Sequence, residues 1–154
     1  MNDAEDHNRE IRGLYHRVLD GWNEQSAEDF AAPFAEDGEV IGFDGSENKG
    51  RSSITEEMSR IFSDHDTGSY VGKVRTVRSV GPGASVLRAV AGMVPAGQSD
   101  LEPKLNTVQT LVAEHIEGEW RVVLYQNTPA QFHGRPELVE NLTEELRQEL
   151  ESRP

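Results

Sequence analysis

Residues 105–130 read LNTVQTLVAEHIEGEWRVVLYQNTPA, and this stretch decides the fold. Apolar and polar residues alternate on both sides of Glu117-Gly118, which is typical of two antiparallel strands joined by a tight hairpin. A period of two gives the first strand one face composed of Thr107, Gln109, Leu111, Ala113 and His115. The second strand divides into two sets: Arg121, Val123, Tyr125 and Asn127 on one face, and Trp120, Val122, Leu124 and Gln126 on the other.

Three amides in this hairpin stand where we expect buried positions. The second strand is apolar on both faces, which indicates a sheet that is covered on both sides. Gln109, Gln126 and Asn127 must then be hydrogen-bonded, because a buried amide without a partner raises the free energy of the folded state. Two roles meet this requirement. The amides brace strand ends or a loop, or one or two of them point into a cavity and bind an oxygen atom of a ligand.

More strands and several helices surround the hairpin. Alternation predicts strands at about 69–80, 84–95, 105–116 and 119–127, and a short strand at 39–43. Apolar residues at three- and four-residue steps predict helices at about 5–24 and 27–34, a third that starts near the Ser53–Glu56 capping box, and a fourth at 136–153. We therefore expect one domain at residues 1–136 and a Glu- and Leu-rich helical tail at 137–154. The tail's leucines need a partner, either the same chain or another subunit.

Composition excludes several classes of function. The chain has 154 residues, 28 acidic and 15 basic, and no cysteine, so its net charge is −13. This charge argues against nucleic acid as a partner, and the lack of cysteine excludes disulfides, thiol catalysis and cysteine-bound zinc. No stretch predicts a membrane span or a secretory signal, so we expect a cytoplasmic protein with no membrane partner. Residues 67–99 carry four bases and no acid, which indicates either a solvated strand face or a surface for an anionic ligand or an acidic subunit.

Motifs for cofactors and metals are absent from the sequence. It has no phosphate-binding glycine loop and no nucleophile elbow, and its five histidines are scattered without metal-ligand spacing. We therefore expect no cofactor and no metal. Asp64-His65-Asp66 and Glu36-Asp37 are candidate acid–base groups, although each is more typical of a solvated helix end or turn.

The order of these elements resembles that of a known family. The stretches FAEDGEVIGFDG (34–45), KGRSSITEEMSRIF (49–62) and GEWRVVLYQNTP (118–129), together with Trp22, are similar to the SnoaL-like branch of the nuclear transport factor two-like superfamily, specifically its SgcJ/EcaC type. The resemblance covers about residues 8–130. It implies an α+β fold of the cystatin-like type, in which a cone-shaped, curved, antiparallel or mixed sheet wraps around three N-terminal helices. It also implies an apolar pocket and a homodimer packed through the outer sheet face.

The catalytic groups of the relatives are missing at the matching positions. A ketosteroid isomerase-like enzyme would have its base at Gly42, its tyrosine at Val18 (Tyr15 is one turn earlier) and its protonated acid near Leu111. The acid of polyketide cyclases would fall at Gln126 or Asn127, both of which are amides. An amide forms hydrogen bonds but does not exchange protons at neutral pH. The catalytic residues stay unknown, and an enzyme of this kind would be a cofactor-free cyclase, isomerase or dehydratase.

The favoured hypothesis is a pocket protein that binds or orients a small hydrophobic ligand, in particular a polyketide intermediate of the enediyne type. The predicted pocket consists of Tyr15, Val18, Trp22, Phe34, Met58, Phe62, Gln109, Leu111, Tyr125 and Asn127. The alternative is a non-catalytic homodimeric interaction module with a vestigial pocket. A homodimer is expected in either case, because Trp120, Val122 and Leu124 would otherwise expose an apolar strand face to water.

Overall fold

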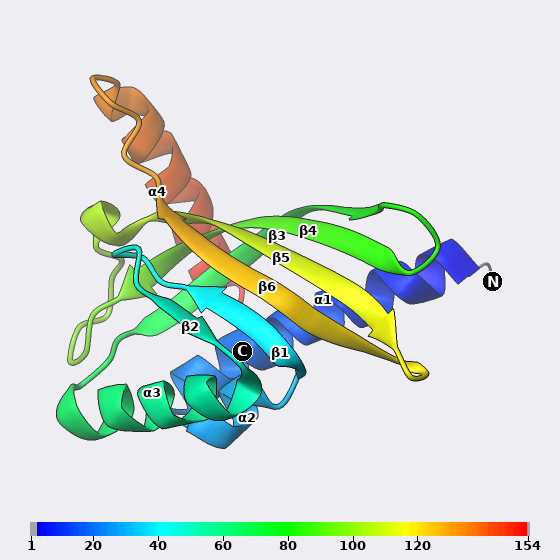
Figure 1. The fold of residues 1–154 in the computed structure, drawn as a ribbon. Coiled ribbons are helices and arrows are strands. Elements are labelled where there is room, and N and C mark those ends of the chain that lie inside the picture. Colours follow the sequence, from blue (N-terminus) through cyan, green and yellow to red (C-terminus); the bar gives the residue numbers. More distant parts are fainter. Residues whose placement is uncertain (1–2, 154) are drawn as a thin grey trace.

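A mixed β-sheet organises the structure, a computed structural model that describes residues 3–153. Within those residues the sheet has six strands in the order β2-β1-β6-β5-β4-β3. The elements are α1 (Asp3–Asn23), α2 (Ala27–Ala31), β1 (Phe34–Ile41), β2 (Glu47–Lys49), α3 (Arg51–Asp64), β3 (Ser69–Ser79), β4 (Ala84–Val94), η1 (Pro103–Leu105), β5 (Thr107–Ile116), β6 (Glu119–Pro129) and α4 (Pro136–Glu151). Helices α1, α2 and α3 lie on one side of the curved sheet and α4 lies on the other (Figure 1). The expected α+β cone with a C-terminal helix is confirmed.

The β5–β6 hairpin forms as the sequence predicts. Glu117 and Gly118 have φ angles of 50° and 87°, which suit a two-residue turn whose twist matches that of the strands. Strands β3 to β6 pair in antiparallel fashion, whereas β1 pairs with β6 in parallel. On β5 the alternation holds, because Thr107, Gln109, Leu111 and Ala113 are buried between exposed or half-buried neighbours.

A β-bulge in β6 overturns the predicted faces of that strand. Val112 pairs with Leu124 and Ala113 pairs with Val122, so Val123 is the extra residue. The bulge reverses the alternation at this point. Trp120 and Val122 therefore share the inner core with Tyr125 and do not lie on the opposite face, as the sequence predicted.

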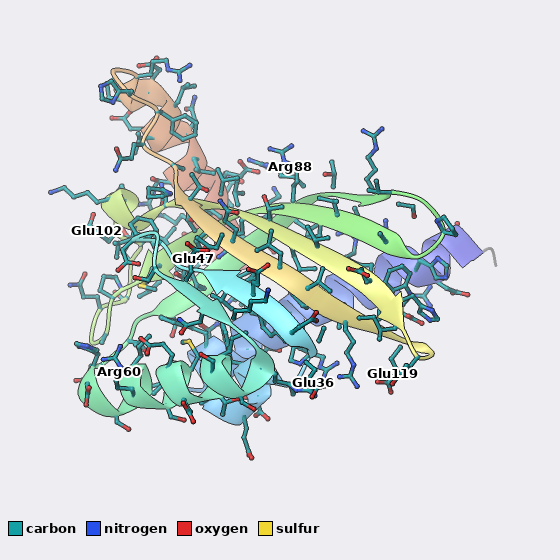
Figure 2. All side chains as sticks on the ribbon, in the orientation of Figure 1. Glu36, Glu47, Arg60, Arg88, Glu102 and Glu119 are labelled. Carbon is teal, nitrogen blue, oxygen red and sulfur yellow. The ribbon has the colours of Figure 1, made fainter. Side chains whose placement is uncertain are left out.

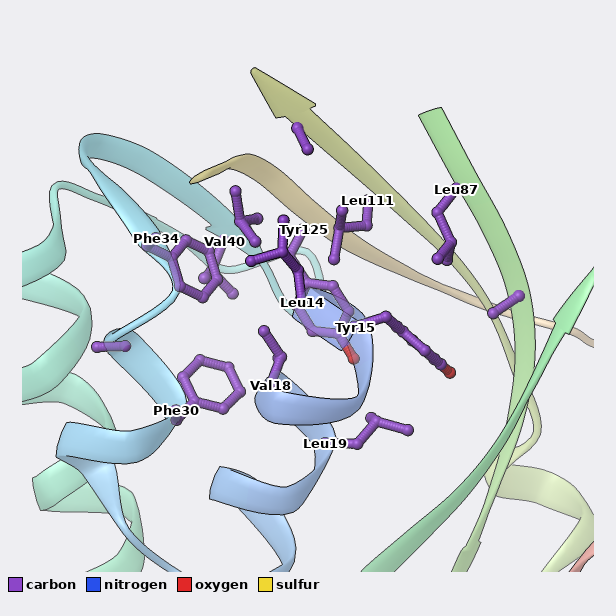
Figure 3. Close-up of a cluster of buried hydrophobic side chains, with 14 of the residues drawn as sticks. Leu14, Tyr15, Val18, Leu19, Phe30, Phe34, Val40, Leu87, Leu111 and Tyr125 are labelled. Atoms are coloured by element: carbon purple, nitrogen blue, oxygen red, sulfur yellow. The ribbon is translucent and has the colours of Figure 1, made fainter. Parts of the chain in front are cut away.

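The inner core forms where α1 and α2 pack against the concave side of the sheet. Its most deeply buried side chains come from the middle of α1 and from the central strands, and they include Tyr15, Val18, Phe34, Leu87 and Leu111. Figure 3 shows these side chains converging between α1 and the strands. These side chains fill the middle of the cone.

Strand β1 and the helix starts differ from the prediction. β1 begins at Phe34 rather than Glu39, because Asp37-Gly38 is an irregularity in the strand and not its start. A Cβ atom on Gly38 would lie 2.7 Å from the carbonyl oxygen of Val122, so only glycine allows this approach of β1 to β6. Ser26 caps α2 as predicted, but α3 begins at Arg51, after Gly50 at φ 95°, without a side-chain cap.

Helix α4 covers part of the convex side of the sheet. Its Leu142 and Leu146 are buried against Val71, Val90 and Leu101 in a second core. The leucine stripe of the tail thus finds its partner in the same chain. No helix within residues 3–153 has the length and apolar character needed to cross a bilayer.

An ion-pair cluster fixes α4 to β3. Glu145 accepts hydrogen bonds from Arg75, with Nη2 2.8 Å from Oε1, and its Oε2 lies 3.1 Å from Nζ of Lys73. Two of the four bases between residues 67 and 99 therefore meet an acidic helix of their own chain. The hydrogen bond from Arg75, supported by Lys73, lowers the pKa of Glu145 to about 2.

The depressed pKa predicts acid-sensitive docking of α4. A carboxyl whose folded-state pKa is lowered stabilises the fold above its unfolded pKa, and that stability is lost as the pH falls from about 4.5 toward 2. We expect Glu145→Gln to lower the free energy of unfolding by about 1 kcal/mol at pH 7, because the cluster is partly exposed to solvent. Urea unfolding at pH 7 and pH 2.5 measures this effect.

The matched control is Glu140→Gln, which removes one charge from an exposed position of the same helix. It should leave stability nearly unchanged at both pH values. An equal destabilisation by Glu145→Gln at pH 7 and pH 2.5 would show that the ion pairs do not hold α4.

Candidate functional site

A cavity of about 390 Å³ opens between the C-terminal end of α1, helices α2 and α3, and strands β1, β3 and β6. Its apolar wall comes from aromatic and aliphatic side chains, and its polar lining comes from the β1–β2 loop, α3 and β6. The lining residues are Trp22, Phe30, Val40, Gly42, Phe43, Asp44, Ser46, Asn48, Glu57, Met58, Arg60, Ile61, Tyr70, Tyr125 and Asn127.

Trp22 is the centre of the aromatic wall. Its ring centroid lies 5.4 Å from those of Phe62 and Tyr70, in edge-on or tilted geometry, and 6.5 Å from that of Phe30. Its indole Nε1 donates to the carbonyl oxygen of Gly68 over 2.9 Å, which fixes the ring at the end of α1. The wall is therefore held in place by a hydrogen bond as well as by packing.

Four predicted pocket residues line this cavity: Trp22, Met58, Tyr125 and Asn127. Phe62 packs behind Trp22 but does not line the cavity. The other five predicted residues are fully buried elsewhere in the core: Tyr15, Val18, Phe34, Gln109 and Leu111. Helix α1 lies directly on the sheet and fills the middle of the cone, so the cavity is confined to one end.

The sequence prediction missed the part of the lining that depends on loops. Gly42, Asp44 and Ser46 belong to the β1–β2 loop, which reads as a simple turn in sequence. Asp44 Oδ1 accepts the backbone N–H of Ser46 at 3.0 Å, and this hydrogen bond lowers the pKa of the Asp44 carboxyl. The sequence showed that Asp44-Gly45 forms a turn. It did not show that this turn lies next to α3 and contributes to the cavity.

A chain of hydrogen bonds links α1 to the cavity. The Tyr15 hydroxyl donates to Oε1 of Gln109 at 2.5 Å, and Nε2 of Gln109 donates to Oδ1 of Asn127 at 2.7 Å. Tyr15 and Gln109 are fully buried, while Asn127 is half-buried and lines the cavity. Gln109 therefore braces the core between α1 and β6, and Asn127 is the amide that reaches the cavity.

The tyrosines near the cavity stay protonated at neutral pH. Burial raises the pKa of Tyr70 to about 12. Burial, with smaller contributions from Tyr15 and Tyr70, also raises the pKa of Tyr125 well above its ordinary value, and the neighbouring Asn127 side chain opposes this rise. These hydroxyls therefore act as neutral hydrogen-bonding groups.

The ionisable groups of the cavity lie at its mouth. Asp44 and Arg60 are exposed, and Arg60, labelled on α3 in Figure 2, forms an ion pair with Glu57. The candidate acid–base groups lie elsewhere. Glu36 and Asp37 line a separate polar depression with Arg51 and Arg121, and Asp64-His65-Asp66 is exposed at the end of α3. Among residues 3–153, no group of three potential ligands is placed to hold a metal ion.

Solved structures with the same architecture include a domain of unknown function with a cystatin-like fold from Nostoc punctiforme. It matches at a TM-score of 0.79 and 25% identity over 96% of this chain and 93% of that chain. A ketosteroid isomerase-like protein from Erwinia carotovora atroseptica matches at a TM-score of 0.64 and 12% identity over 85% of this chain and 99% of that one. The chain has the cystatin-like fold of NTF2-like proteins.

Other NTF2-like structures agree with this assignment. An NTF2-like protein of unknown function from Shewanella oneidensis matches at a TM-score of 0.64 and 15% identity, over 78% of this chain and 97% of that one. No model of a known protein family matches the sequence, and no curated protein does. These similarities show the cystatin-like fold that the resemblance implied, and no match supports the SgcJ/EcaC type.

Helix α1 approaches β3 so closely at Gly72 that we expect a larger residue there to destabilise the fold. A Cβ atom at this position would lie 2.3 Å from the Tyr15 hydroxyl oxygen and 2.6 Å from Cδ1 of Leu19. We expect Gly72→Ala to lower the free energy of unfolding by about 1–3 kcal/mol, because the packed core must shift to admit the methyl group. Thermal and urea unfolding measure the change.

Gly13→Ala on α1 is the control. A Cβ atom there meets nothing within 4 Å, so alanine should stabilise the helix by about 0.5–1 kcal/mol. A neutral Gly72→Ala variant would contradict the tight contact between Tyr15 and β3.

Proposed function

We propose that this NTF2-like protein binds a small apolar molecule in the cavity between α1, α3 and β6 and orients it through Asn127 and Tyr125. The observation that carries the proposal is the combination of an aromatic wall around Trp22 with two polar groups on one strand. Ligand sites are typically apolar cavities of this size order with a few polar groups that fix orientation.

The chemistry of the lining favours orientation over proton transfer. Tyr125 and Tyr70 are neutral at physiological pH, and the amide of Asn127 does not titrate. Holding a flexible molecule in a reactive conformation accelerates its reaction without any titrating group. If the protein is an enzyme, we therefore expect a cofactor-free cyclase, isomerase or dehydratase that acts mainly by positioning.

A polyketide intermediate of the enediyne type is the proposed ligand class. The support comes from the sequence resemblance to the SgcJ/EcaC type and from the structural similarity to a ketosteroid isomerase-like protein. Such intermediates are apolar and carry several carbonyl oxygens, which suits an aromatic wall with hydrogen-bonding groups at its inner end.

A cavity-filling variant tests the proposal. Gly42 lines the cavity, and a Cβ atom there meets no atom closer than 3.5 Å, so Gly42→Phe should fold and occupy the ligand volume. The probe is 2-acetylnaphthalene, a small aromatic ketone, followed by quenching of tryptophan fluorescence. We expect saturable binding to the unmodified protein and at least a tenfold weaker affinity for Gly42→Phe.

Gly83→Phe provides the control for this experiment. Gly83 lies in the β3–β4 turn with open space around its Cβ position, so the variant adds the same side chain outside the cavity. It should bind the ketone as the unmodified protein does. Equal affinity of Gly42→Phe and Gly83→Phe would refute the cavity as the binding site.

The second candidate function is a homodimeric interaction module. Val86, Val112 and Leu124 form one row across the convex side of β4, β5 and β6, beside the part that α4 covers. The apolar row therefore differs from the one expected from sequence: Leu124 stays in it, whereas Trp120 and Val122 lie in the inner core. Arg88 projects from β4 on the same convex side (Figure 2). We propose that a second copy of the chain covers this row, as the superfamily resemblance implies.

Light scattering tests the dimer. We expect a mass near twice the chain mass of 17.1 kDa at micromolar concentration. Val112→Glu, in the middle of the row, should give the monomer mass because burying a carboxylate there is unfavourable. Val80→Glu, at an exposed valine outside the row, is the control and should stay dimeric. A monomer mass for the unmodified protein would exclude this proposal.

A further inference from the structure

We propose that the hydrogen-bond chain Tyr15–Gln109–Asn127 makes the inner end of the cavity a hydrogen-bond donor site that selects a neutral carbonyl oxygen, with Tyr15 as the positioning residue that sets this preference. The proposal rests on the proposed ligand-binding function and adds the chemistry of the group that is recognised. It also gives a role to a buried tyrosine that does not line the cavity.

Tyr15 fixes which way the hydrogen bonds of the Tyr15–Gln109–Asn127 series point. Its hydroxyl carries one hydrogen, and the acceptor at hydrogen-bond distance is Oε1 of Gln109. On its other side the hydroxyl faces Gly72 and the methyl group of Leu19, neither of which presents a side-chain acceptor. Figure 3 shows the Tyr15 side chain leaving α1 toward the strands. If Gln109 turned its N–H group toward Tyr15, the buried tyrosine hydrogen would lose its partner, which is costly.

The hydrogen bond from Tyr15 in turn fixes the orientation of the two amides, Gln109 and Asn127. With Oε1 of Gln109 turned to Tyr15, its Nε2 must face Asn127, and the atom it meets at 2.7 Å is Oδ1. Thr107, which does not line the cavity, has its Oγ1 3.4 Å from the same oxygen. Because an amide is planar, Nδ2 of Asn127 is turned away from Gln109, and we infer that it faces the cavity that this residue lines.

The end of the chain presents donors to a ligand. Asn127 lines the cavity with its oxygen already held by Gln109, so its amide hydrogens are left for a ligand, and the neutral hydroxyl of Tyr125 in the same lining can donate a further hydrogen. Hydrogen bonds arranged in one direction polarise each other, so the terminal donors are strengthened. A carbonyl oxygen accepts two such hydrogens, whereas a saturated hydrocarbon leaves them without partners.

The surroundings disfavour an anion at the same place. Asp44 and Glu57 stand at the mouth of the cavity, Arg60 is already paired with Glu57, and the chain has a net charge of −13. A carboxylate would have to be stripped of water next to an aromatic wall without a free cation. The cavity therefore fits a neutral ketone, quinone or ester oxygen.

Three probes of the same shape separate these possibilities. They are 2-acetylnaphthalene, 2-isopropylnaphthalene and 2-naphthoate, which offer a ketone, no oxygen and a carboxylate. With the unmodified protein we expect the ketone to bind about 5–10-fold more tightly than the hydrocarbon, the range that one net hydrogen bond supplies. We expect the carboxylate to bind most weakly. The infrared carbonyl band of the bound ketone, labelled with ¹³C, should shift to lower frequency than in hexane.

Two variants then locate the origin of the preference. Tyr15→Phe frees both amides to rotate, so the ketone-to-hydrocarbon ratio should fall to about 1–2, and the carbonyl band should broaden or return toward its hexane position. Asn127→Asp removes the terminal donor at a half-buried site and should give the same result even if Tyr15→Phe does not fold. Thr143→Val is the control, because it removes a buried, hydrogen-bonded hydroxyl from the opposite side of the sheet and should keep both ratio and band.

The outcomes distinguish this proposal from the one on which it rests. If none of the three probes binds, the proposed ligand-binding function fails, and this inference fails with it. If ketone and hydrocarbon bind equally to the unmodified protein, or if Tyr15→Phe and Asn127→Asp keep its ratio and its carbonyl band, the cavity stands as a binding site and the donor chain is overturned.

Discussion

The contact of α1 with the concave side of the sheet determines how much of the interior is open. Tyr15 lies over Gly72 at a distance that admits no additional carbon atom, and its hydroxyl is held by Gln109 on β5. This pairing presses the middle of the helix onto the strands, and the space between them is filled. The cavity lies at the C-terminal end of α1, where Trp22 packs against Tyr70 of β3 and donates a hydrogen bond to the backbone of Gly68.

The two sides of the sheet are used differently. The concave side carries the main core and the cavity, and the convex side is divided between α4 and the row formed by Val86, Val112 and Leu124. The attachment of α4 combines buried leucines with the ion pairs of Glu145, so part of the basic segment serves intramolecular packing. This division leaves the row of Val86, Val112 and Leu124 outside the area that α4 covers.

The sequence predicted the architecture well because its four long strands are separated by clear turn signals and because Glu117-Gly118 is typical of a short hairpin turn. It failed at Val123, since an alternating pattern carries no mark of the residue at which a bulge reverses it. Six of the ten predicted pocket residues also lie outside the lining of the cavity. Apolar residues such as Val18, Phe34 and Leu111 are compatible with a cavity wall and with a filled core, and the distance between α1 and the sheet decides between them. That distance depends on Gly72, far away in sequence.

The polar groups of the Tyr15–Gln109–Asn127 network determine which chemistry the cavity can support. Gln109 is buried among apolar side chains, and an apolar residue of similar size would fill the same volume without needing partners. Its amide can stay there because Tyr15 satisfies its oxygen and Asn127 accepts from its nitrogen. A network held so completely has little freedom to rearrange, and none of its members changes charge near neutral pH. Under the proposed function, a site built in this way would recognise and orient a ligand oxygen, and any rate enhancement would come from the geometry in which that oxygen is held.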